Sequence, residues 1–261
     1  MKIAIELQKV TSKMNDMEKF YLDGHINFNF KEDKNSEETI SSLSEILQGN
    51  LKEDFKLLSK YSNTYDLRPF ASDYDNSFLK VLLSTGVYKK LCNLIGVNLD
   101  LFHIQVRITD NKSNLADQVS YMDWHRDTYF KDNKIMGYFP PCHKIIFYPS
   151  FSSDPKPMLK VLPGSHRMDV HYDQSYNGGI LNNFDKSLLT QVPAKTISSS
   201  NNDFTIFNTA LLHGAYADQT PEKSIRIIYS FLLPEQMKKD HPAHHRLLGE
   251  KFKKEVESYG G

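Results

Sequence analysis

The chain has 261 residues, with 32 Lys and Arg against 32 Asp and Glu, 39% hydrophobic and 12% aromatic residues. A formal net charge of zero supplies no long-range positive field, which argues against nucleic acid or an anionic membrane surface as a partner. The composition predicts a packed core and excludes a disordered chain. Since single β barrels with added helices reach ~250 residues, we expect one domain over residues 1–261.

Cysteine usage and the amino-terminal sequence indicate the compartment. Cys92 and Cys142 lie far apart and form no Cys-x-x-Cys pair, so the sequence predicts neither a zinc knuckle nor a disulfide framework. The first ten residues, MKIAIELQKV, place polar side chains where a signal peptide needs an unbroken apolar stretch. No later run approaches ~18 apolar residues. We therefore expect a cytoplasmic protein with no membrane partner.

The first third of the chain predicts mostly helix. The stretch MEKFYLDGHINFNF is typical of a helical turn that stops at Gly24, followed by a strand with alternating apolar residues over 26–30. Apolar residues then recur at three- and four-residue spacing over 40–55, and again over 78–94 before Gly96. These two amphipathic helices define a helical part of about residues 36–96.

After Asn98 the pattern changes to short apolar runs separated by turn residues: LFHIQVRIT, YMDWHRD, KIIFYPSF, MLKVLP, DFTIFN and SIRIIYSFLL. Several short strands of this kind are typical of a β barrel or sandwich, here over about residues 99–233. The charged tail, about residues 234–259, predicts one closing helix. Its packed face would be formed by Leu247, Leu248, Phe252 and Val256.

A candidate metal site lies in the stretch YMDWHRDTYF. His125 and Asp127 stand two apart on an expected strand and so project to the same side, and His213 follows at the end of a later strand. Two histidines and a carboxylate on one face of a ferrous ion leave three positions open, enough for a chelating cosubstrate and dioxygen. The alternative is a surface histidine beside an acid. By the same alternation Trp124 points into the core.

Arg226 is the second candidate, because it lies inside the apolar run SIRIIYSFLL. Alternation puts Ile225, Ile227 and Tyr229 on one side and the arginine on the other. A buried guanidinium favours an anion, and a carboxylate held in bidentate fashion is the natural partner. The alternatives are an ion pair with one of the chain's own acids or an outward-facing edge arginine.

In order and approximate spacing these residues resemble the phytanoyl-CoA dioxygenase-like family of iron(II)- and 2-oxoglutarate-dependent oxygenases. The resemblance covers residues 17–233 and rests on FYLDG at 20–24, His125-x-Asp127, PGSHR at 163–167, His213 and Arg226. It implies a mainly β fold with flanking helices, a double-stranded β-helix of the jelly-roll, cupin-like kind. Fe(II) would be held by His125, Asp127 and His213, and Arg226 would hold the distal carboxylate of 2-oxoglutarate. Dioxygen and a small-molecule substrate complete the expected partners.

Other residues are candidates for 2-oxoglutarate contacts. The family usually places such a contact on the strand before the His-x-Asp motif, which points to Gln105 and Arg107, and Lys144 on the following strand is a further candidate. The alternative is that this strand face meets solvent. His166 and Arg167 are expected to support the structure. His241, His244 and His245 are expected to form a solvated helix start and not a metal cluster.

The leading hypothesis is therefore a dioxygenase that hydroxylates a C–H bond of a small or medium metabolite and releases succinate and CO2. The alternative is a cupin-like metal-binding isomerase or a non-catalytic binding module built on the same barrel. A protein-interaction domain without metal is a third hypothesis, which requires the three ligand residues to coincide by accident. PKPMLK at residues 155–160 replaces the family's usual Asn-Gly, so the substrate contacts stay open, as does the oligomeric state.

Overall fold

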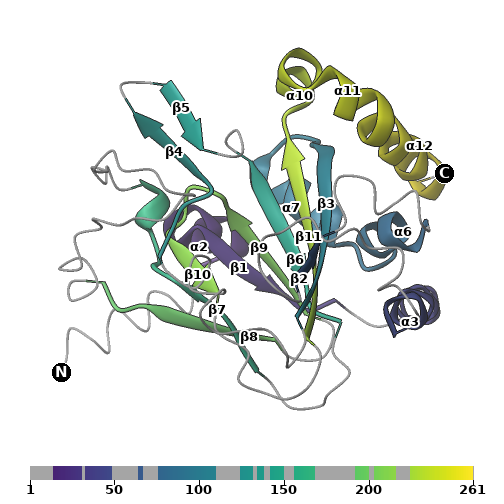
Figure 1. Ribbon diagram of the computed structural model, residues 1–261, viewed down its shortest axis with the longest axis horizontal. Helices are drawn as coiled ribbons and strands as arrows, with labels where there is room; N and C mark the ends of the chain where they lie inside the picture. The colour runs from purple at the N-terminus through teal and green to yellow at the C-terminus, as the bar shows by residue number, and fades with distance from the viewer. Residues whose placement is uncertain are drawn as a thin grey trace.

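The computed structural model of the chain describes residues 14–30, 33–48, 64–66, 76–109, 124–131, 134–137, 142–149, 156–167, 192–199, 203–215 and 224–260. Two antiparallel sheets face one another, and helices cover the outer face of the larger sheet (Figure 1). The expected mainly β fold with flanking helices is confirmed. The assignment of the whole chain to one domain stays a prediction.

The chain opens as the sequence predicts. Helix α2 (Asp16–Asp23) begins with a capping box, in which the side chains of Asn15 and Glu18 each accept a hydrogen bond from the other's backbone N–H. Gly24 ends the helix in the left-handed conformation, with φ of 80°. Strand β1 (His25–Phe28) follows directly.

The larger sheet has the strand order β1-β9-β6-β11-β3-β2, and all its neighbours are antiparallel. Its remaining strands are β2 (Thr64–Asp66), β3 (Asp100–Thr109), β6 (His143–Phe147), β9 (Phe204–Asn208) and β11 (Ser224–Leu232). Consecutive members of this sheet come from distant parts of the chain, as in a jelly roll. The smaller sheet, in the order β10-β7-β8, consists of β7 (Lys156–Val161), β8 (Lys195–Ser199) and β10 (His213–Ala215).

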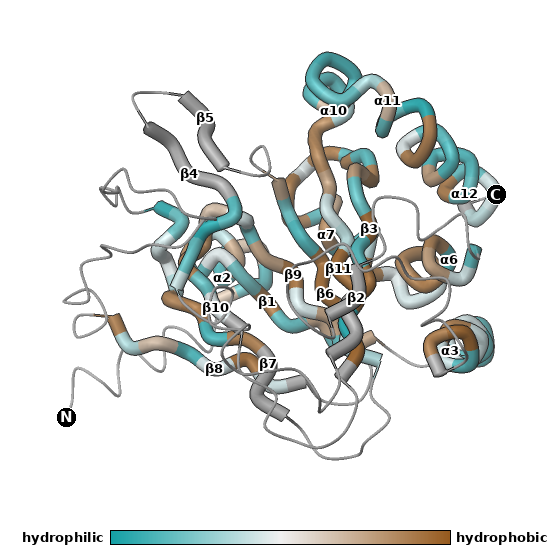
Figure 2. Tube along the Cα trace, in the orientation of Figure 1, coloured by the Kyte–Doolittle hydropathy of each residue, from teal (hydrophilic) through white to brown (hydrophobic). Residues whose placement is uncertain are grey.

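Alternation along the strands gives the larger sheet two different faces. The outer face contributes buried apolar residues to a core shared with the helices. The inner face packs Ile146, Phe207 and Ile228 against residues of the smaller sheet such as Leu159 and Ile197. Hydrophobic residues accordingly concentrate in the central strands, as Figure 2 shows. A separate hairpin, β4 (Thr128–Lys131) and β5 (Lys134–Gly137), extends away from both sheets (Figure 1).

Three further helices of the described residues lie between β1 and β3. The first is α3 (Lys34–Gln48), which confirms the first half of the helix expected over 40–55, while Leu51 and Phe55 lie outside the described residues. The single helix expected over 78–94 is wrong. It is divided into α6 (Ser77–Ser84) and α7 (Val87–Ile95), because Gly86 adopts the left-handed conformation between them, with φ of 73°.

Regular alternation over LFHIQVRIT predicts Phe102, Ile104 and Val106 on one face and His103 and Gln105 on the other, and strand β3 follows this only in part. Ile104 and Val106 lie in the outer core, and His103 and Gln105 lie on the opposite, inner face. A register shift in the pairing with β11 skips Phe102, so that Leu101 takes its expected place in the outer core. Phe102 instead packs with residues of the other face and of the tail, including Met237.

The tail does not form the single closing helix that we expected. It consists of α10 (Pro234–Asp240), α11 (Pro242–His244), a π-helical turn (His245–Gly249) and α12 (Glu250–Gly260). Leu248 and Phe252 are buried as predicted, but the altered periodicity leaves Leu247 57% exposed. In the described part of the chain, no helix combines the length and the apolar character needed to cross a membrane.

The tail histidines are half-buried and contact strand β3, which corrects the expected solvated helix start. The rings of His241 and His244 lie 4.6 and 5.0 Å from the ring of Phe102, and Nδ1 of His244 lies 3.2 Å from the Phe102 carbonyl oxygen. His245 lies 3.6 Å from a carboxylate oxygen of Asp100. These histidines therefore attach the tail to the start of β3.

Two left-handed helix-ending glycines allow a matched stability test. Replacing Gly96 by alanine places a methyl group where there is no atom within 4 Å, so only the backbone cost of about 1 kcal/mol applies. The same change at Gly24 places the methyl group 2.5 Å from Nδ1 of His166, which adds an overpacking cost of about 1–3 kcal/mol. Denaturant unfolding of both variants measures the difference. Equal losses would contradict the close contact between Gly24 and the PGSHR segment.

Candidate metal centre

Backbone hydrogen bonds bring the two histidines of the candidate site together. His125 and His213 form an isolated antiparallel bridge, in which each N–H donates to the other's carbonyl oxygen, at 2.8 and 2.9 Å. Two residues further on, the N–H of Asp127 donates to the carbonyl oxygen of Thr209 at 3.1 Å. Backbone hydrogen bonds therefore join both His125 and Asp127 to the segment from Thr209 to His213.

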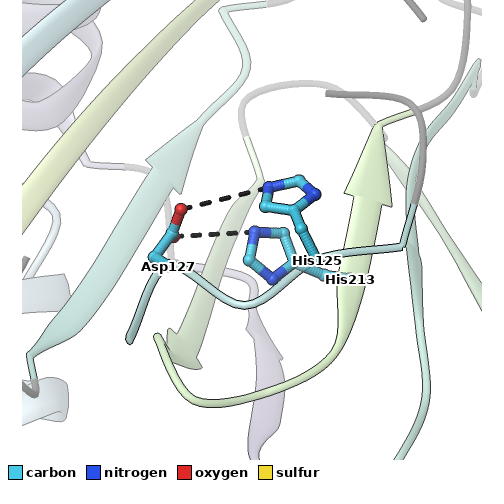
Figure 3. A group of neighbouring side chains, drawn as sticks. All are labelled: His125, Asp127 and His213. Atoms are coloured by element: carbon cyan, nitrogen blue, oxygen red, sulfur yellow. Dashed lines mark ion pairs between the residues drawn. The ribbon is translucent and has the colours of Figure 1, made fainter. Parts of the chain in front are cut away.

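The three side chains converge as the sequence predicts. One ligand atom from each of His125, Asp127 and His213 lies within 4.8 Å of the others (Figure 3). Nε2 of His213 lies 3.6 Å from one carboxylate oxygen of Asp127, and Nε2 of His125 lies 4.0 Å from the other. Among the residues that the structure describes, this is the one such group of three His, Cys, Asp or Glu side chains.

His213 is prepared to act as a neutral ligand. Its Nδ1 lies 2.8 Å from the carbonyl oxygen of Leu211, which can only accept, so Nδ1 carries the hydrogen and Nε2 keeps a lone pair directed at the cluster. Burial, together with the nearby His125, lowers the pKa of His213 to about 3. The imidazole is therefore uncharged at neutral pH, the form that binds metal.

Lys144 is the electrostatic partner of the carboxylate. Its Nζ lies 2.7 Å from an oxygen of Asp127, and the two side chains are only 8% and 16% exposed. Burial by itself raises the pKa of Asp127, but the positive charge of Lys144 and the neighbouring histidines outweigh it and hold that pKa well below its usual range. Asp127 is thus an anion, the form in which a carboxyl group binds metal. Two imidazole nitrogens and one carboxylate fit a first-row divalent metal such as Fe(II).

Two other predicted contacts, Gln105 and Arg226, lie on the inner face of the larger sheet. Gln105 is 3% exposed and Arg226 is 8% exposed, so the solvent-facing alternative is wrong for both. Arg107 pairs with Arg226 in the register of β3 and β11, and its side chain lies outside the described residues. In the register of β11 and β6, Ile228 pairs with Ile146, and two positions further along the sheet Ser230 pairs with Lys144. One face therefore presents Gln105, Arg226 and Lys144, with Lys144 at the cluster of His125, Asp127 and His213.

The PGSHR segment has the structural role that we expected. The hydroxyl oxygen of Ser165 accepts a hydrogen bond of 2.8 Å from the N–H of Leu212, next to the ligand His213. His166 and Arg167 contact the carbonyl oxygens of Tyr21 and Leu22 in helix α2. The segment therefore connects the opening helix to the ligand-bearing turn.

Several contributions could not be found from the sequence. The side chain of Arg126, between the two ligands of the motif, is buried and donates to the carbonyl oxygen of Ser165. Thr209 donates to and accepts from the backbone of Cys142, and this gives the turn before His213 its position. Trp124 is not fully buried, contrary to expectation, and Nζ of Lys160 lies 5.2 Å from its ring centre. Among these residues only Ser165, which accepts the hydrogen bond from Arg126, lies in a motif that the sequence analysis identified, PGSHR.

Comparison with known proteins identifies the fold. No family model and no curated protein matches the sequence. Solved structures that match include the alpha-ketoglutarate-dependent carbocyclase SnoK from nogalamycin biosynthesis (TM-score 0.59, 9% identity, 85% of each chain covered). The epimerase SnoN in complex with Fe3+, alpha ketoglutarate and nogalamycin RO also matches (TM-score 0.58, 14% identity, 88% of this chain and 85% of that chain).

A third match is HygX from Streptomyces hygroscopicus with nickel, 2-oxoglutarate and hygromycin B bound (TM-score 0.55, 13% identity, 82% of this chain and 84% of that chain). At these identities the matches show the fold alone, and the predicted double-stranded β-helix of the jelly-roll, cupin-like kind is confirmed. Membership of the phytanoyl-CoA dioxygenase-like family stays a prediction.

Replacing Lys144 by methionine tests the charge balance of the cluster. The change leaves the Asp127 carboxylate buried without its ammonium partner, so we expect the metal-free protein to lose about 3 kcal/mol of unfolding free energy. A divalent metal would replace the lost positive charge, so the increase in melting temperature on adding metal should exceed that of the parent protein. Lys238→Met, on the surface, serves as the control. A metal-free variant as stable as its parent would contradict this role.

Proposed function

We propose that the chain is an Fe(II)- and 2-oxoglutarate-dependent oxygenase that hydroxylates a C–H bond of a small or medium metabolite. The observation that carries the proposal is the convergence of His125, Asp127 and His213 within 4.8 Å. The convergence occurs in a fold shared with proteins that were crystallised with Fe3+ or nickel and a 2-oxo acid. A buried arginine on the inner face, Arg226, adds a group suited to a carboxylate.

In this proposal the protein's own residues bind and orient. His125 and His213 offer imidazole nitrogens to Fe(II), and Asp127 offers a carboxylate oxygen. Lys144 holds the Asp127 side chain in one orientation, because its ammonium group lies 2.7 Å from one oxygen. Arg226 binds the distal carboxylate of 2-oxoglutarate, while Gln105, Arg107 and Lys144 are candidates for its other polar atoms.

The chemistry that ferrous iron and 2-oxoglutarate supply when bound is oxidative. 2-Oxoglutarate loses CO2 and becomes succinate, and the two atoms of dioxygen are divided between succinate and the hydroxylated substrate. Oxidation of the substrate requires that few protein groups near the metal react in place of the substrate C–H bond. The inner face meets that requirement near the cluster, because the apolar side chains of Ile146, Phe207 and Ile228 line it together with the smaller sheet.

Other oxidative outcomes use the same scaffold elsewhere. The similar structures include a carbocyclase and an epimerase, both dependent on alpha ketoglutarate. The class of reaction is therefore better supported than hydroxylation in particular. The alternative of a metal-binding isomerase or a non-catalytic binding module predicts metal binding without any role for a 2-oxo acid, and one titration separates the two hypotheses.

Anaerobic titration of the protein with Fe(II) and then 2-oxoglutarate tests the proposal. We expect the visible metal-to-ligand charge-transfer band of a chelated 2-oxo acid. The band should be lost in His213→Ala and Asp127→Ala, because each removes one of three metal ligands. His244→Ala is the control, since His244 packs against Phe102 and is not one of the three cluster side chains. Iron binding without a band would favour the isomerase or the binding module.

Arg226→Met tests the cosubstrate site. We expect 2-oxoglutarate affinity, measured from the same band, to fall about 100-fold, equivalent to ~2.8 kcal/mol, because a buried carboxylate would lose its cationic partner. Iron affinity should change little, since Arg226 is not among the ligand side chains. An equal loss of iron and 2-oxoglutarate binding would show damage to the fold, and unchanged affinity for both would remove Arg226 from the site.

A further inference from the structure

Tyr148 lies on the inner face beside Arg226, at a position to which the sequence drew no attention. Ile227 pairs with Phe147 in the register of β11 and β6, so the residues next to them, Arg226 and Tyr148, stand across from one another. Tyr148 follows the last residue of β6, and Pro149 after it favours an extended backbone. The alternation of β6 therefore continues to Tyr148 and places its side chain on the face that carries Lys144 and Ile146.

The phenol of Tyr148 is buried and its hydroxyl has no hydrogen-bond partner. The residue is 3% exposed, and its oxygen contacts no donor or acceptor among the described residues. Burying a hydroxyl without a partner costs free energy, so such a group in a binding site indicates that a ligand supplies the partner. Burial raises the pKa of Tyr148 to about 12, although the positive charge of Arg226 opposes the increase. The phenol therefore keeps its hydrogen at neutral pH and can donate it.

An unpartnered hydroxyl is not sufficient evidence by itself, as Tyr229 demonstrates. Its hydroxyl is also buried without a partner, but its side chain belongs to the outer core among the helices. Tyr148 differs in two respects: it lies on the inner face, and its hydroxyl is within the electrostatic influence of a buried guanidinium. A phenol donor beside a guanidinium is suited to an anion with two or more oxygen acceptors.

We propose that Tyr148 is a cosubstrate-binding residue, which donates a hydrogen bond to the distal carboxylate of 2-oxoglutarate beside Arg226. The inference rests on the proposed function. Arg226 and Tyr148 stand four residues, or ~13 Å along the strands, from Ser230 and Lys144 at the metal end of the face. An extended five-carbon diacid, with side chains reaching toward it from both ends, can span that separation. Its keto-acid end then lies at the cluster and its distal end at Tyr148.

The test compares two 2-oxo acids of the same carbon number on the Fe(II)-loaded protein. 2-Oxoglutarate carries the distal carboxylate and 2-oxopentanoate lacks it. In Tyr148→Phe we expect the affinity for 2-oxoglutarate, read anaerobically from the charge-transfer band, to fall between about 10- and 100-fold, as for a hydrogen bond to a charged group. The affinity for 2-oxopentanoate should stay the same, since that ligand gives Tyr148 no acceptor. Selectivity between the two acids would therefore fall by the same factor.

Tyr229→Phe is the matched control, because it removes an equally buried hydroxyl from the other face of the sheet. It should leave the affinity for both acids unchanged. If Tyr148→Phe also leaves both affinities unchanged and only raises the melting temperature, the hydroxyl is an unpartnered core group and the inference is wrong, while the proposed function stands. If the parent protein binds iron but gives no band with either acid, the proposed function and this inference both fail.

Discussion

The whole site depends on the reciprocal backbone hydrogen bonds between His125 and His213. The two ligands are separated by most of the β-helix in sequence, and this bridge holds their backbones in register. Two further sets of hydrogen bonds hold the turn before His213. The Thr209 hydroxyl bonds to the backbone N–H and carbonyl oxygen of Cys142, and the Ser165 hydroxyl oxygen accepts from the N–H of Leu212. Backbone bonds of this kind set the positions of the ligand side chains before any metal arrives. The fold therefore prearranges the three side chains that we propose as metal ligands.

Charge is the second constraint, because the site is largely removed from water. A carboxylate as buried as Asp127 needs a positive partner, and Lys144 supplies one in the metal-free protein. A divalent cation at the same carboxylate would add positive charge beside that ammonium, and the neutral state of His213 limits the resulting repulsion. Lys144 therefore has two effects: it orients the Asp127 carboxylate, and it stabilises the buried negative charge when no metal is bound. A lysine on the surface would contribute little to either, because exposed ion pairs are weak.

Local spacing was sufficient to predict that these three side chains cluster, and it failed where the backbone departs from regular geometry. His125 and Asp127 converge as predicted, although the expected strand is reduced there to the isolated bridge between His125 and His213. Alternation gave the wrong environment for Phe102, which is an extra residue without a partner in the pairing with β11, and helical spacing missed the break at Gly86. In the tail, a π-helical turn exposes Leu247 although its spacing suited a packed face. Long-range contacts, such as Thr209 with Cys142, have no local signature at all.

Tyr148 illustrates why a binding residue can escape sequence reasoning. In KIIFYP it continues an apolar run and, by composition, is an ordinary core aromatic. Only the pairing of β6 with β11 places it opposite Arg226, and only its burial shows that the hydroxyl has no partner within the described protein. The inner face then has two polar ends, the cluster of His125, Asp127 and His213 with Lys144, and a guanidinium with a phenol, which are joined by apolar side chains. That division suits a ligand with a chelating head, a short hydrocarbon chain and an anionic tail.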